Sequence, residues 1–371
     1  MILEYAKSLK PCTGSDKTKI ATVVGARPQF IKCAPVSRLI RECHQEIIIH
    51  TGQHYDEEMS DIFFKELGIP KPEYNLGVGS GTHGEQTAKM LVRIEYVLIK
   101  EQPDIVMVYG DTNSTVAGAL AAAKLNIPLA HVEAGLRSFD RTMPEEINRI
   151  VTDHLSITNF SPTYAAVTNL KNEGITGNVF LVGDTTTDAM IMMMPIVWRS
   201  DILNRLNLAK KQYCVMTLHR PSNTDTKDVL STILNTISGV SNLPIIFPCH
   251  PRTRESIFRN GLIVPANIIV VPPMGYTDML CLMKHAYRIF TDSGGMQKEA
   301  YNLGTPCITL RDTTEWPETV NTGWNTLAGT DPDQIKKAFD RDTPFDQITL
   351  YDTGASRRIV EILNGMNGDA I

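Results

Sequence analysis

Acidic side chains recur at the ends of predicted elements in the middle of the chain, between residues 105 and 155. The acidic positions are Asp111, Glu133 and Glu145, and the cations interleaved with them are Arg137, Arg141 and Arg149. Several carboxylates set among arginines are typical of a site that transfers protons beside an anion. These residues are therefore the first candidates for catalysis.

The elements around these residues place them together. Apolar runs at 105–108 and 128–130 predict two strands, and small residues at 113–125 predict the helix that joins them. Strands joined in this way are parallel, so Asp111 and Glu133 follow neighbouring strand ends, at the edge where open α/β sheets bind ligands. A further helix opens at Pro144 and runs to 155. Glu145 lies in its first turn, where acidic residues also complement the helix dipole, so its catalytic interpretation depends on its register with the other two.

The first strand, at 20–24, leads into Gly25 and then Pro28, which marks a strand-to-helix corner. Free backbone N–H groups at such a helix start attract an anion, and Arg27 and Lys32 add positive charge. The alternative is a surface loop with two solvated cations. We expect further elements at 46–50 (strand), 56–67 (helix), 68–81 (loop) and 86–100 (helix), and strands at 157–160 and 179–182.

Predicted strands and helices alternate again after a connecting segment at 191–207. Five strands are predicted, at 213–218, 244–248, 267–271, 288–291 and 306–310, and the sheet is expected to be complete after 316–318. Each strand stops at polar or turn-forming residues, which predicts a second binding edge. His219 and His250 stand out only because each follows one of these strands.

The sharpest anion signal on this second edge is the run of Ser293, Gly294 and Gly295, between a predicted strand and a predicted helix. Two glycines let the backbone approach a diphosphate, and the helix points its amino end there. Glu299, one turn later, is placed to accept hydrogen bonds from ribose hydroxyls. A plain turn is the alternative for an isolated Ser-Gly-Gly.

Bulk properties narrow the class of protein. At 371 residues two domains are expected, and a net charge of −5 disfavours nucleic acid as a partner. The seven cysteines are scattered without a C-x-x-C pair, which argues against a zinc site or a disulfide framework and favours a reduced, cytoplasmic setting. No apolar run is long enough for a bilayer, and the first residues lack a signal-peptide core. Neither G-x-G-x-x-G nor G-x-x-x-x-G-K-[ST] occurs, so the usual dinucleotide fold and the P-loop are disfavoured.

The expected organisation has four parts. Residues 1–19 form a flexible extension, 20–188 a Rossmann-like domain with the acidic edge, and 189–350 a second Rossmann-like domain with the phosphate edge. Residues 351–371 contain an amphipathic helix at 356–363 that packs back on the first domain.

Taken in order, the motifs resemble the non-hydrolysing UDP-N-acetylglucosamine 2-epimerases, from about residue 20 to 362. They are GARPQFIK (25–32), TGQHYD (51–56), YGDTNS (109–114), HVEAGLRS (131–138), MPEEINR (143–149), TLHRPSN (217–223), HPR (250–252), DSGGMQKEA (292–300) and RDTTEWPE (311–318). The resemblance implies the α/β GT-B fold, two Rossmann-like domains whose parallel sheets face an interdomain cleft, and a homodimer. It also implies interconversion of UDP-N-acetylglucosamine and UDP-N-acetylmannosamine for surface-glycan precursors, by elimination of UDP to a 2-acetamidoglucal and re-addition. No cofactor and no metal are expected.

The family's roles carry over by motif. The implied catalytic residues are Asp111, Glu133, Glu145 and His219, and the implied substrate-binding residues are Arg27, Lys32, Arg149, Arg220, His250, Ser293, Gly294, Gly295 and Glu299. Gln53 and His54 match a possible second, regulatory site. The residues after them, Tyr55-Asp56-Glu57, depart from the Gln-His-Arg-x-Met pattern of regulated bacterial members, which puts allosteric activation in doubt.

Three alternatives remain open at this stage. Gln29 in GARPQFIK resembles the branch that acts on UDP-2,3-diacetamido-uronic acids. A GT-B glycosyltransferase would share the nucleotide edge but would not need three acidic groups around one sugar carbon. A non-catalytic UDP-sugar sensor would have little reason to keep those acids together.

Overall fold

The computed structural model describes residues 17–53, 64, 66–342 and 353–365. They divide into two compact units, of which unit 1 holds the described residues up to Met192 together with 353–365, and unit 2 begins at Met193. Each unit is built on one sheet, with seven strands in unit 1 and six in unit 2. Three of the predictions fall wholly or partly outside the described residues. They concern residues 1–16 of the extension, most of the helix at 56–67, and His54.

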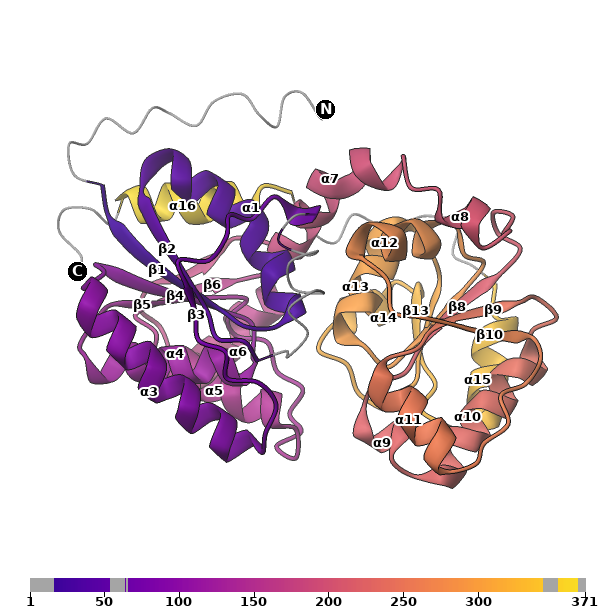
Figure 1. Ribbon diagram of the computed structural model, residues 1–371. Coiled ribbons are helices and arrows are strands. Elements are labelled where there is room, and N and C mark those ends of the chain that lie inside the picture. The colour runs from indigo at the N-terminus through magenta and orange to yellow at the C-terminus, as the bar shows by residue number, and fades with distance from the viewer. Residues whose placement is uncertain (1–16, 54–63, 65, 343–352, 366–371) are drawn as a thin grey trace. The chain divides into compact units, whose positions relative to one another are not determined.

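The elements of unit 1 alternate strands and helices (Figure 1). They are β1 (Lys19–Val24), α1 (Arg27–Cys43), β2 (Gln45–His50), β3 (Tyr74–Asn75), α3 (His83–Glu101), β4 (Ile105–Tyr109), α4 (Asn113–Lys124), β5 (Leu129–Val132), α5 (Pro144–Leu155), β6 (Thr158–Ser161), α6 (Tyr164–Asn172), β7 (Val179–Leu181), α7 (Thr185–Val197) and α16 (Ala355–Gly365). Helix α7 runs across the boundary between the two units.

The sheet of unit 1 is parallel throughout, in the order β3-β2-β1-β4-β5-β6-β7. The order reverses between β1 and β4, which pair with Val23 opposite Val108. Ligands of doubly wound sheets bind at such a reversal, outside the carboxyl ends of the strands. The Gly25 corner and Asp111 follow these two strands, so the fold places both at the reversal.

Helices cover both faces of this sheet, with α1 and α16 on one face and α3, α4 and α5 on the other (Figure 1). Strands buried on both faces need apolar residues at nearly every position. All five residues of β4 are buried, and Val106 and Val108 join a core with the inner faces of α3 and α4. The same continuous apolar runs made the strands visible in the sequence.

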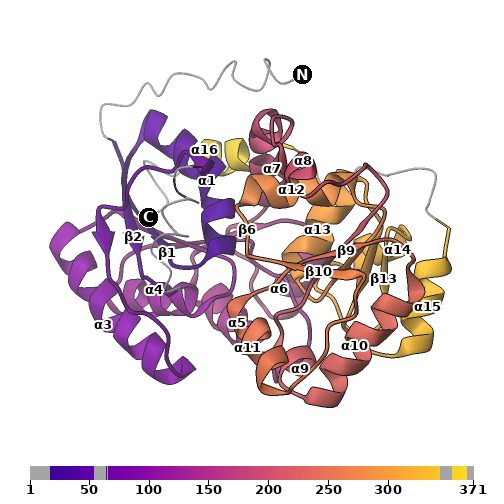
Figure 2. The ribbon, with the colours of Figure 1, turned by 45° about the vertical axis from the view of Figure 1, so that its right-hand side comes forward.

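The last described helix, α16, lies beside the first, and the two adjoin in both views (Figures 1 and 2). The buried carboxylate of Asp188 in α7 accepts hydrogen bonds from the backbone N–H groups of Gly354 and Ser356, both at 2.7 Å. Arg358 donates to the Val182 carbonyl at 2.7 Å. These contacts hold α16 on the rest of unit 1.

Unit 2 has its own set of elements. They are α8 (Ile202–Arg205), β8 (Cys214–Thr217), α9 (Pro221–Thr224), α10 (Lys227–Val240), β9 (Ile245–Pro248), α11 (Pro251–Arg259), β10 (Ile268–Val271), α12 (Tyr276–His285), β11 (Ile289–Thr291), α13 (Gly294–Leu303), β12 (Cys307–Thr309), α14 (Pro317–Asn321), β13 (Asn325–Leu327) and α15 (Pro332–Asp340). The sheet is again parallel, in the order β10-β9-β8-β11-β12-β13, and it reverses between β8 and β11. Both sheets therefore have doubly wound order, although the usual dinucleotide fingerprint is absent.

Two predictions about the sheets are wrong. The segment 68–81, expected to be a loop, contains the edge strand β3, where the Leu76 N–H donates to the His50 carbonyl at 2.8 Å. The second sheet does not end at 316–318, because β13 adds a sixth strand. Buried Asn325 in β13 hydrogen-bonds to Thr309 at 2.6 Å and to Gln297 at 3.1 Å, so polar partners replace the apolar pattern that marks other strands.

Two further observations concern the cysteines and the helices. Cys33, Cys214, Cys249, Cys281 and Cys307 are buried free thiols. Burial raises the pKa of the Cys214 thiol to about 11. Cys43 is disulfide-bonded, which the scattered spacing of the cysteines did not predict. Within the described ranges, no helix combines the length and the apolar character that crossing a bilayer requires.

Candidate active site

The corner after β1 is built around a glycine and a buried amide. A Cβ at Gly25 would lie 1.9 Å from Thr51 Oγ1 and 2.3 Å from Ser114 Oγ, so no larger residue fits without rearrangement. The side-chain oxygen of buried Gln29 accepts from the Gly25 N–H at 2.8 Å, and its nitrogen donates to the Tyr109 carbonyl at 3.0 Å. Gln29 thus ties the corner after β1 to the end of β4.

Lys32 and Glu133 form an ion pair beside this corner. Lys32 Nζ lies 2.6 Å from Glu133 Oε2, and both side chains are largely buried. A Cβ at Gly110 would come within 3.2 Å of the Lys32 ammonium and 3.4 Å of the Glu133 carboxylate, so the pair sits directly over the end of β4. Burial lowers the pKa of Lys32, but the negative charges of Glu133 and Asp111 outweigh it and the pKa is raised overall. Lys32 is therefore a firmly protonated cation among acids.

The backbone at Glu133 is strained. Its φ of +74° lies in the left-handed region, which costs a residue with a side chain about 1–2 kcal/mol. The N–H groups of Glu133 and Ala134 both donate to the Phe160 carbonyl at 3.0 Å, which fixes this conformation. Strain of this kind persists where the surroundings over-determine it, and functional sites are a common place.

Asp111 is held from α5 at two points. Arg149 forms an ion pair with its carboxylate, and Asn148 donates to its backbone carbonyl at 2.9 Å. The Asp111 side chain stays about 29% exposed, so it remains accessible to a ligand. Arg149 is itself buried, and its second contact is to Glu146 at 2.8 Å. The arginine expected to bind substrate thus also orders two carboxylates.

Glu146, which the sequence analysis did not single out, is a buried acceptor. It takes hydrogen bonds from the backbone N–H groups of Ser138 and Phe139, each at 2.9 Å, in addition to Arg149. This carboxylate shapes the loop between β5 and α5. Phe139 has a φ of +60° and is 78% exposed, so the loop presents an aromatic ring to solvent.

The remaining residues of the first edge differ in surroundings. Glu145 is half-buried in the first turn of α5, and within the described residues it has no hydrogen-bond or ion-pair partner. Arg27 is half-buried at the start of α1, and Arg141 is exposed. Gln53 accepts from the Ser114 N–H and hydroxyl at 3.1 and 2.7 Å, which links it to the start of α4.

Arg137 does not join the carboxylates that the sequence grouped it with. It forms a two-point pair with Glu173, at 2.7 Å for each contact, and donates to Asp153 at 2.7 Å. Its charge is therefore committed to a buried network. In that network His131 lies fully buried, with Nδ1 2.6 Å from Asp153 and Nε2 2.7 Å from the Gly110 carbonyl.

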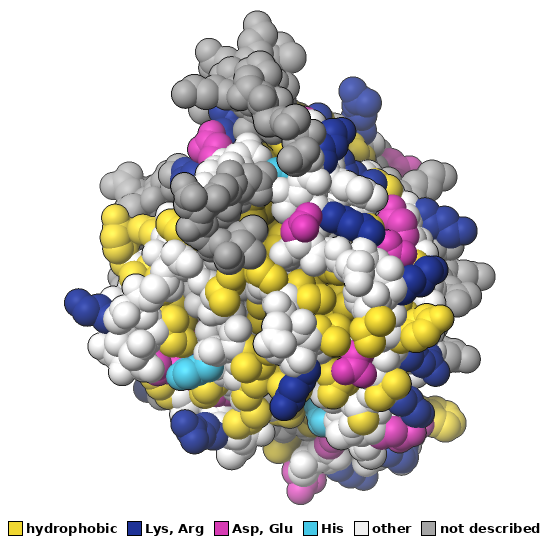
Figure 3. Space-filling view, turned by 90° about the vertical axis from the view of Figure 1, so that its left-hand side faces the viewer, with side chains coloured by type: hydrophobic (Ala, Val, Ile, Leu, Met, Phe, Trp, Pro, Cys, Tyr) yellow, Lys and Arg dark blue, Asp and Glu magenta, His cyan; other side chains and the backbone are white. Residues whose placement is uncertain are grey.

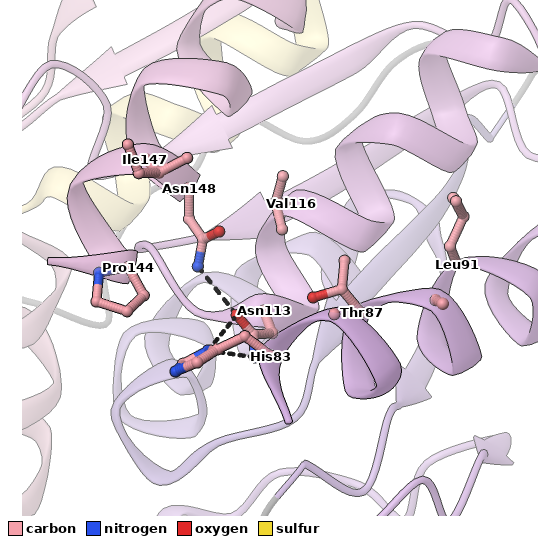
Figure 4. Close-up of a pocket in the computed structure, with 10 residues that line it drawn as sticks. His83, Thr87, Leu91, Asn113, Val116, Pro144, Ile147 and Asn148 are labelled. Atoms are coloured by element: carbon pink, nitrogen blue, oxygen red, sulfur yellow. Dashed lines mark hydrogen bonds between the residues drawn. The ribbon is translucent and has the colours of Figure 1, made fainter. Parts of the chain in front are cut away.

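A surface pocket of about 580 Å³ lies between α3, α4 and α5 (Figure 4). Its polar residues are joined, since Asn113 contacts His83 Nδ1 at 3.1 Å and Asn148 at 3.3 Å, while apolar side chains such as Leu91 and Val116 form the rest. Asn148 also contacts Asp111, so the pocket and the acidic edge share a residue.

In unit 2, the reversal between β8 and β11 brings His219 to Asp292. His219 Nδ1 lies 2.8 Å from Asp292 Oδ1; the histidine is about half exposed and the aspartate is buried. Burial raises the pKa of Asp292, but the His219 contact and the backbone N–H groups of His219 and Arg220 outweigh it, so the pKa is lowered. An ionised Asp292 accepts Nδ1–H and leaves His219 Nε2 free to exchange a proton with a ligand.

The turn at 293–295 opens α13, as the sequence predicted. Ser293 is its N-cap, and the helix begins at Gly294. A Cβ at Gly294 would lie 3.1 Å from Glu315 Oε2, because the segment after β12 packs on this turn. Glu299 lies one turn into α13 and is buried. Backbone N–H groups at this helix start suit an anion.

A buried cation adjoins the same helix. Lys298 Nζ lies 3.8 Å from the centre of the Trp316 ring, and both residues are buried. Arg311 and Glu315 form a two-point ion pair at 3.0 and 2.8 Å. Both arrangements bring the 311–316 segment against α13.

His250 and Arg220 complete the second edge. His250 is the exposed N-cap of α11, and its Nδ1 accepts from the Arg252 N–H at 3.3 Å. Arg220 Nε donates to the Asp292 carbonyl at 3.2 Å. Within the described part of the chain, no group of three or more His, Cys, Asp or Glu side chains could hold a metal ion.

Sequence reasoning missed the residues that support the site: Gln29, His131, Glu146, Asn148, Asp153 and Asp292. Gln29 had a usable signal, since a glutamine at the third position of a helix often bonds back to the preceding backbone. The others reach their partners only through tertiary contacts, which local spacing does not report.

Two doubly wound parallel sheets, each with candidate site residues at its point of reversal, are the architecture of a GT-B-like nucleotide-sugar enzyme. A family model described as UDP-N-acetylglucosamine 2-epimerase matches residues 39–364. This chain belongs to the UDP-N-acetylglucosamine 2-epimerase family, a family of isomerases.

Individual relatives agree with this assignment. A protein of Methanococcus maripaludis named a UDP-N-acetylglucosamine 2-epimerase homolog is 53% identical, over 94% of this chain and 100% of that protein. The UDP-2,3-diacetamido-2,3-dideoxy-D-glucuronate 2-epimerase of Pseudomonas aeruginosa is 47% identical, over 93% and 99%. The structure of the Methanocaldococcus jannaschii UDP-GlcNAc 2-epimerase in complex with UDP-GlcNAc and UDP matches with a TM-score of 0.87 and 45% identity, over 94% and 99%.

Proposed function

We propose that the protein interconverts UDP-N-acetylglucosamine and UDP-N-acetylmannosamine without a cofactor. The observation that carries the proposal is the gathering of Asp111, Glu133 and Lys32 at the reversal of the first sheet, in a chain of this family. We place the enzyme in the cytoplasm, in the synthesis of precursors for surface glycans.

The proposed chemistry begins at C2 of the sugar. The C2 proton has no neighbouring carbonyl, so its removal alone would leave an unstabilised carbanion. A base takes the proton while the C1–O bond to UDP breaks, which yields UDP and 2-acetamidoglucal. A proton then adds to the opposite face of C2, and a phosphate oxygen of UDP re-forms the bond to C1. The two steps together therefore need a base on one face of C2 and an acid on the opposite face.

The proposed proton-transfer groups are Asp111, Glu133, Glu145 and His219. The contacts made by these four groups differ. Asp111 and Glu133 are each paired with a cation, whereas Glu145 is half-buried without such a partner among the described residues. His219 is oriented by Asp292.

The proposed ligands of UDP are cations and backbone donors for the diphosphate, with one carboxylate for the ribose. They are Arg27, Lys32, Arg149, Arg220, His250, Ser293, Gly294, Gly295 and Glu299. A departing diphosphate is stabilised by fixed donors of this kind, and no reorganisation is needed when its charge develops. The helix start at Gly294 supplies backbone N–H groups, and Glu299 is assigned to the ribose hydroxyls.

The test is incubation with UDP-N-acetylglucosamine alone in D₂O. The expected result is a mixture of the two epimers with deuterium at C2. Asp111→Asn and Glu133→Gln are each expected to lower the rate by about 10²–10⁴-fold, while UDP still binds. Unlabelled, unchanged starting material would reject the epimerase proposal and favour a glycosyltransferase or a sensor. Free N-acetylmannosamine with UDP would indicate a hydrolytic enzyme instead.

A UDP-2,3-diacetamido-uronic acid is the second candidate substrate, because the Pseudomonas aeruginosa relative named for that activity is 47% identical over nearly the whole chain. Gln29 gives this candidate no direct support. Its amide is buried and hydrogen-bonded to Gly25, Ala26, Tyr109 and Thr115, so it shapes the corner rather than the sugar pocket. Parallel D₂O incubations with the two substrates, compared by kcat/KM, decide between them.

We also propose that the protein is a homodimer, with helix α3 of unit 1 in the interface. Val92, Tyr96 and Ile99 of α3 are 64%, 71% and 58% exposed, at the spacing of one helical face. Hydrophobic side chains gather on the side of unit 1 in Figure 3, where Figure 1 places α3. Tyr96→Glu is expected to give monomers in light scattering, whereas Tyr164→Glu, at an equally exposed tyrosine of α6, leaves the dimer intact. A monomeric wild type would reject the homodimer, and a Tyr96→Glu dimer would reject this interface.

A further inference from the structure

Asp111 and Glu133 follow the neighbouring strands β4 and β5, and the backbone at the end of both strands is unusual. Gly110, just before Asp111, has a φ of +60°, and Glu133 has a φ of +74°. Two adjacent left-handed positions need contacts that hold them. The Phe160 carbonyl holds Glu133, and a buried group of side chains around His131 holds Gly110.

His131 is the link between the two turns. It lies in β5, fully buried, two residues before Glu133, and its Nε2 is 2.7 Å from the Gly110 carbonyl. The Gly110 N–H donates to the Val132 carbonyl at 3.0 Å, also in β5. The backbone N–H and the backbone carbonyl of Gly110 are therefore both held by β5, the strand that ends just before Glu133.

Asp153 of α5 holds the histidine from its other side. Its Oδ1 is 2.6 Å from His131 Nδ1, and its Oδ2 accepts from the Gly135 N–H at 3.1 Å and from Arg137 at 2.7 Å. Burial raises the pKa of Asp153, but the contacts with His131 and Arg137 outweigh it and the pKa is lowered. Asp153 is thus a carboxylate that can only accept hydrogen bonds.

The hydrogen-bond pattern fixes the form of the ring. Nε2 faces a carbonyl oxygen and Nδ1 faces a carboxylate, and neither acceptor can donate. Two ring N–H donors are therefore the arrangement that satisfies both oxygens. A neutral ring would leave a lone pair against an oxygen in the core, where an unmade hydrogen bond is costly.

We propose that His131, doubly protonated and hydrogen-bonded to Asp153, is a positioning residue for the C2 proton transfers. Its hydrogen bond to the Gly110 carbonyl fixes the position of Asp111 relative to Glu133. This inference rests on the proposed function of Asp111 and Glu133. His131 itself touches neither substrate nor reacting atoms. Its loss should therefore change the rate of the chemical step more than the binding of the nucleotide.

The test uses two amide replacements that keep different halves of the contact. The amide of asparagine reaches the position of Nδ1 and keeps the hydrogen bond to Asp153. The amide of glutamine reaches the position of Nε2 and keeps the hydrogen bond to the Gly110 carbonyl. His131→Asn is expected to lower kcat by about 10–10²-fold, as for a catalytic group displaced by about 1 Å. KM for the UDP-sugar should stay within about threefold, and His131→Gln should keep kcat within about threefold of wild type. The value of kcat is calculated per UDP-binding site, so that unfolded protein does not lower it.

His44→Asn is the matched control, because His44 is a buried histidine at the end of α1, before β2 and away from the carboxyl ends of the strands. It should lose stability without losing kcat. Equal losses of kcat in His131→Asn and His131→Gln, no loss in His131→Asn, or an equal loss in His44→Asn would each overturn the proposal. If His131→Asn does not fold, nitrogen NMR of the wild-type ring decides: two protonated nitrogens support the proposal, and a neutral ring overturns it.

Asp111→Asn, measured in parallel, separates the two levels of inference. Full activity in Asp111→Asn would remove the proposed role of Asp111 and the basis for positioning it. Loss of activity in Asp111→Asn with full activity in His131→Asn would overturn only the positioning role.

Discussion

Replacing Lys32 with methionine tests how the first edge is held together. Lys32 and Glu133 are 2.6 Å apart, where the Coulomb attraction at an effective dielectric constant of 20 is about 6 kcal/mol. Desolvation offsets a large part of this, since the two side chains are only 14% and 7% exposed. Removing one partner of a buried pair typically costs about 3–5 kcal/mol, because the remaining charge loses its partner. We expect Lys32→Met to lower the free energy of unfolding by about 3 kcal/mol.

The assay is denaturant unfolding of Lys32→Met, Glu133→Gln and the double variant. The double variant should recover much of the stability that Lys32→Met loses, with a coupling energy of about 2 kcal/mol. None of the three variants should epimerise UDP-N-acetylglucosamine at the wild-type rate. A coupling energy below about 0.5 kcal/mol would refute the reasoning, because the two charges would then not depend on one another.

The same pair predicts the behaviour of the protein in base. Interaction with Glu133 and Asp111 raises the pKa of Lys32 above 10.5 despite burial. A raised pKa in the folded state contributes stability that is complete below the unfolded value and is lost as the pH rises through the folded value. Stability should therefore fall above about pH 10.5, and Lys32→Met should remove this part of the fall.

Other predictions concern acid stability and glycine positions. The pKa values of Asp153 and Asp292 are lowered in the folded protein. The stability that these carboxylates contribute is therefore present above about pH 4 and is lost as the pH falls through their folded pKa values. Unfolding measured between pH 5 and pH 2 should show this loss of stability, and Asp292→Asn should make the loss smaller. Gly25→Ala should abolish activity and destabilise the protein by more than about 2 kcal/mol, because its Cβ would lie 1.9 Å from Thr51 Oγ1. Gly84→Ala, in α3 with open space around the new Cβ, should instead stabilise by up to about 1 kcal/mol, and equal effects of the two substitutions in thermal unfolding would contradict this account.

The sequence predicted the fold class and most of the strands because buried parallel strands need long apolar runs. β4 and β8 were visible for this reason, and their polar ends marked the two edges. The strands that were missed, β3 and β13, are two and three residues long. Their pairing depends on backbone hydrogen bonds and on polar side chains such as Asn325, neither of which leaves a hydrophobic pattern.

The candidate site followed the same division. Asp111, Glu133 and the 293–295 turn were predictable because each follows a strand at a recognisable type of turn. The residue with which each side chain pairs was not predictable from the sequence. Arg137 was expected among the carboxylates of the site but pairs with Glu173 and Asp153. Asp292, read only as part of a motif, proved to orient His219. Such pairings depend on distances between elements that are far apart in the sequence.

The position of α16 has a consequence for the synthesis of the protein. This helix packs on α1 and is tied to Asp188, yet more than 150 residues separate it in sequence from the rest of unit 1. Domains generally fold as units while the chain leaves the ribosome, at roughly 5–20 residues per second. The described strands of unit 2 are all available as soon as β13 emerges, whereas unit 1 must wait for α16, which follows β13 in the chain. The half of the protein that begins first is therefore the half that is completed last.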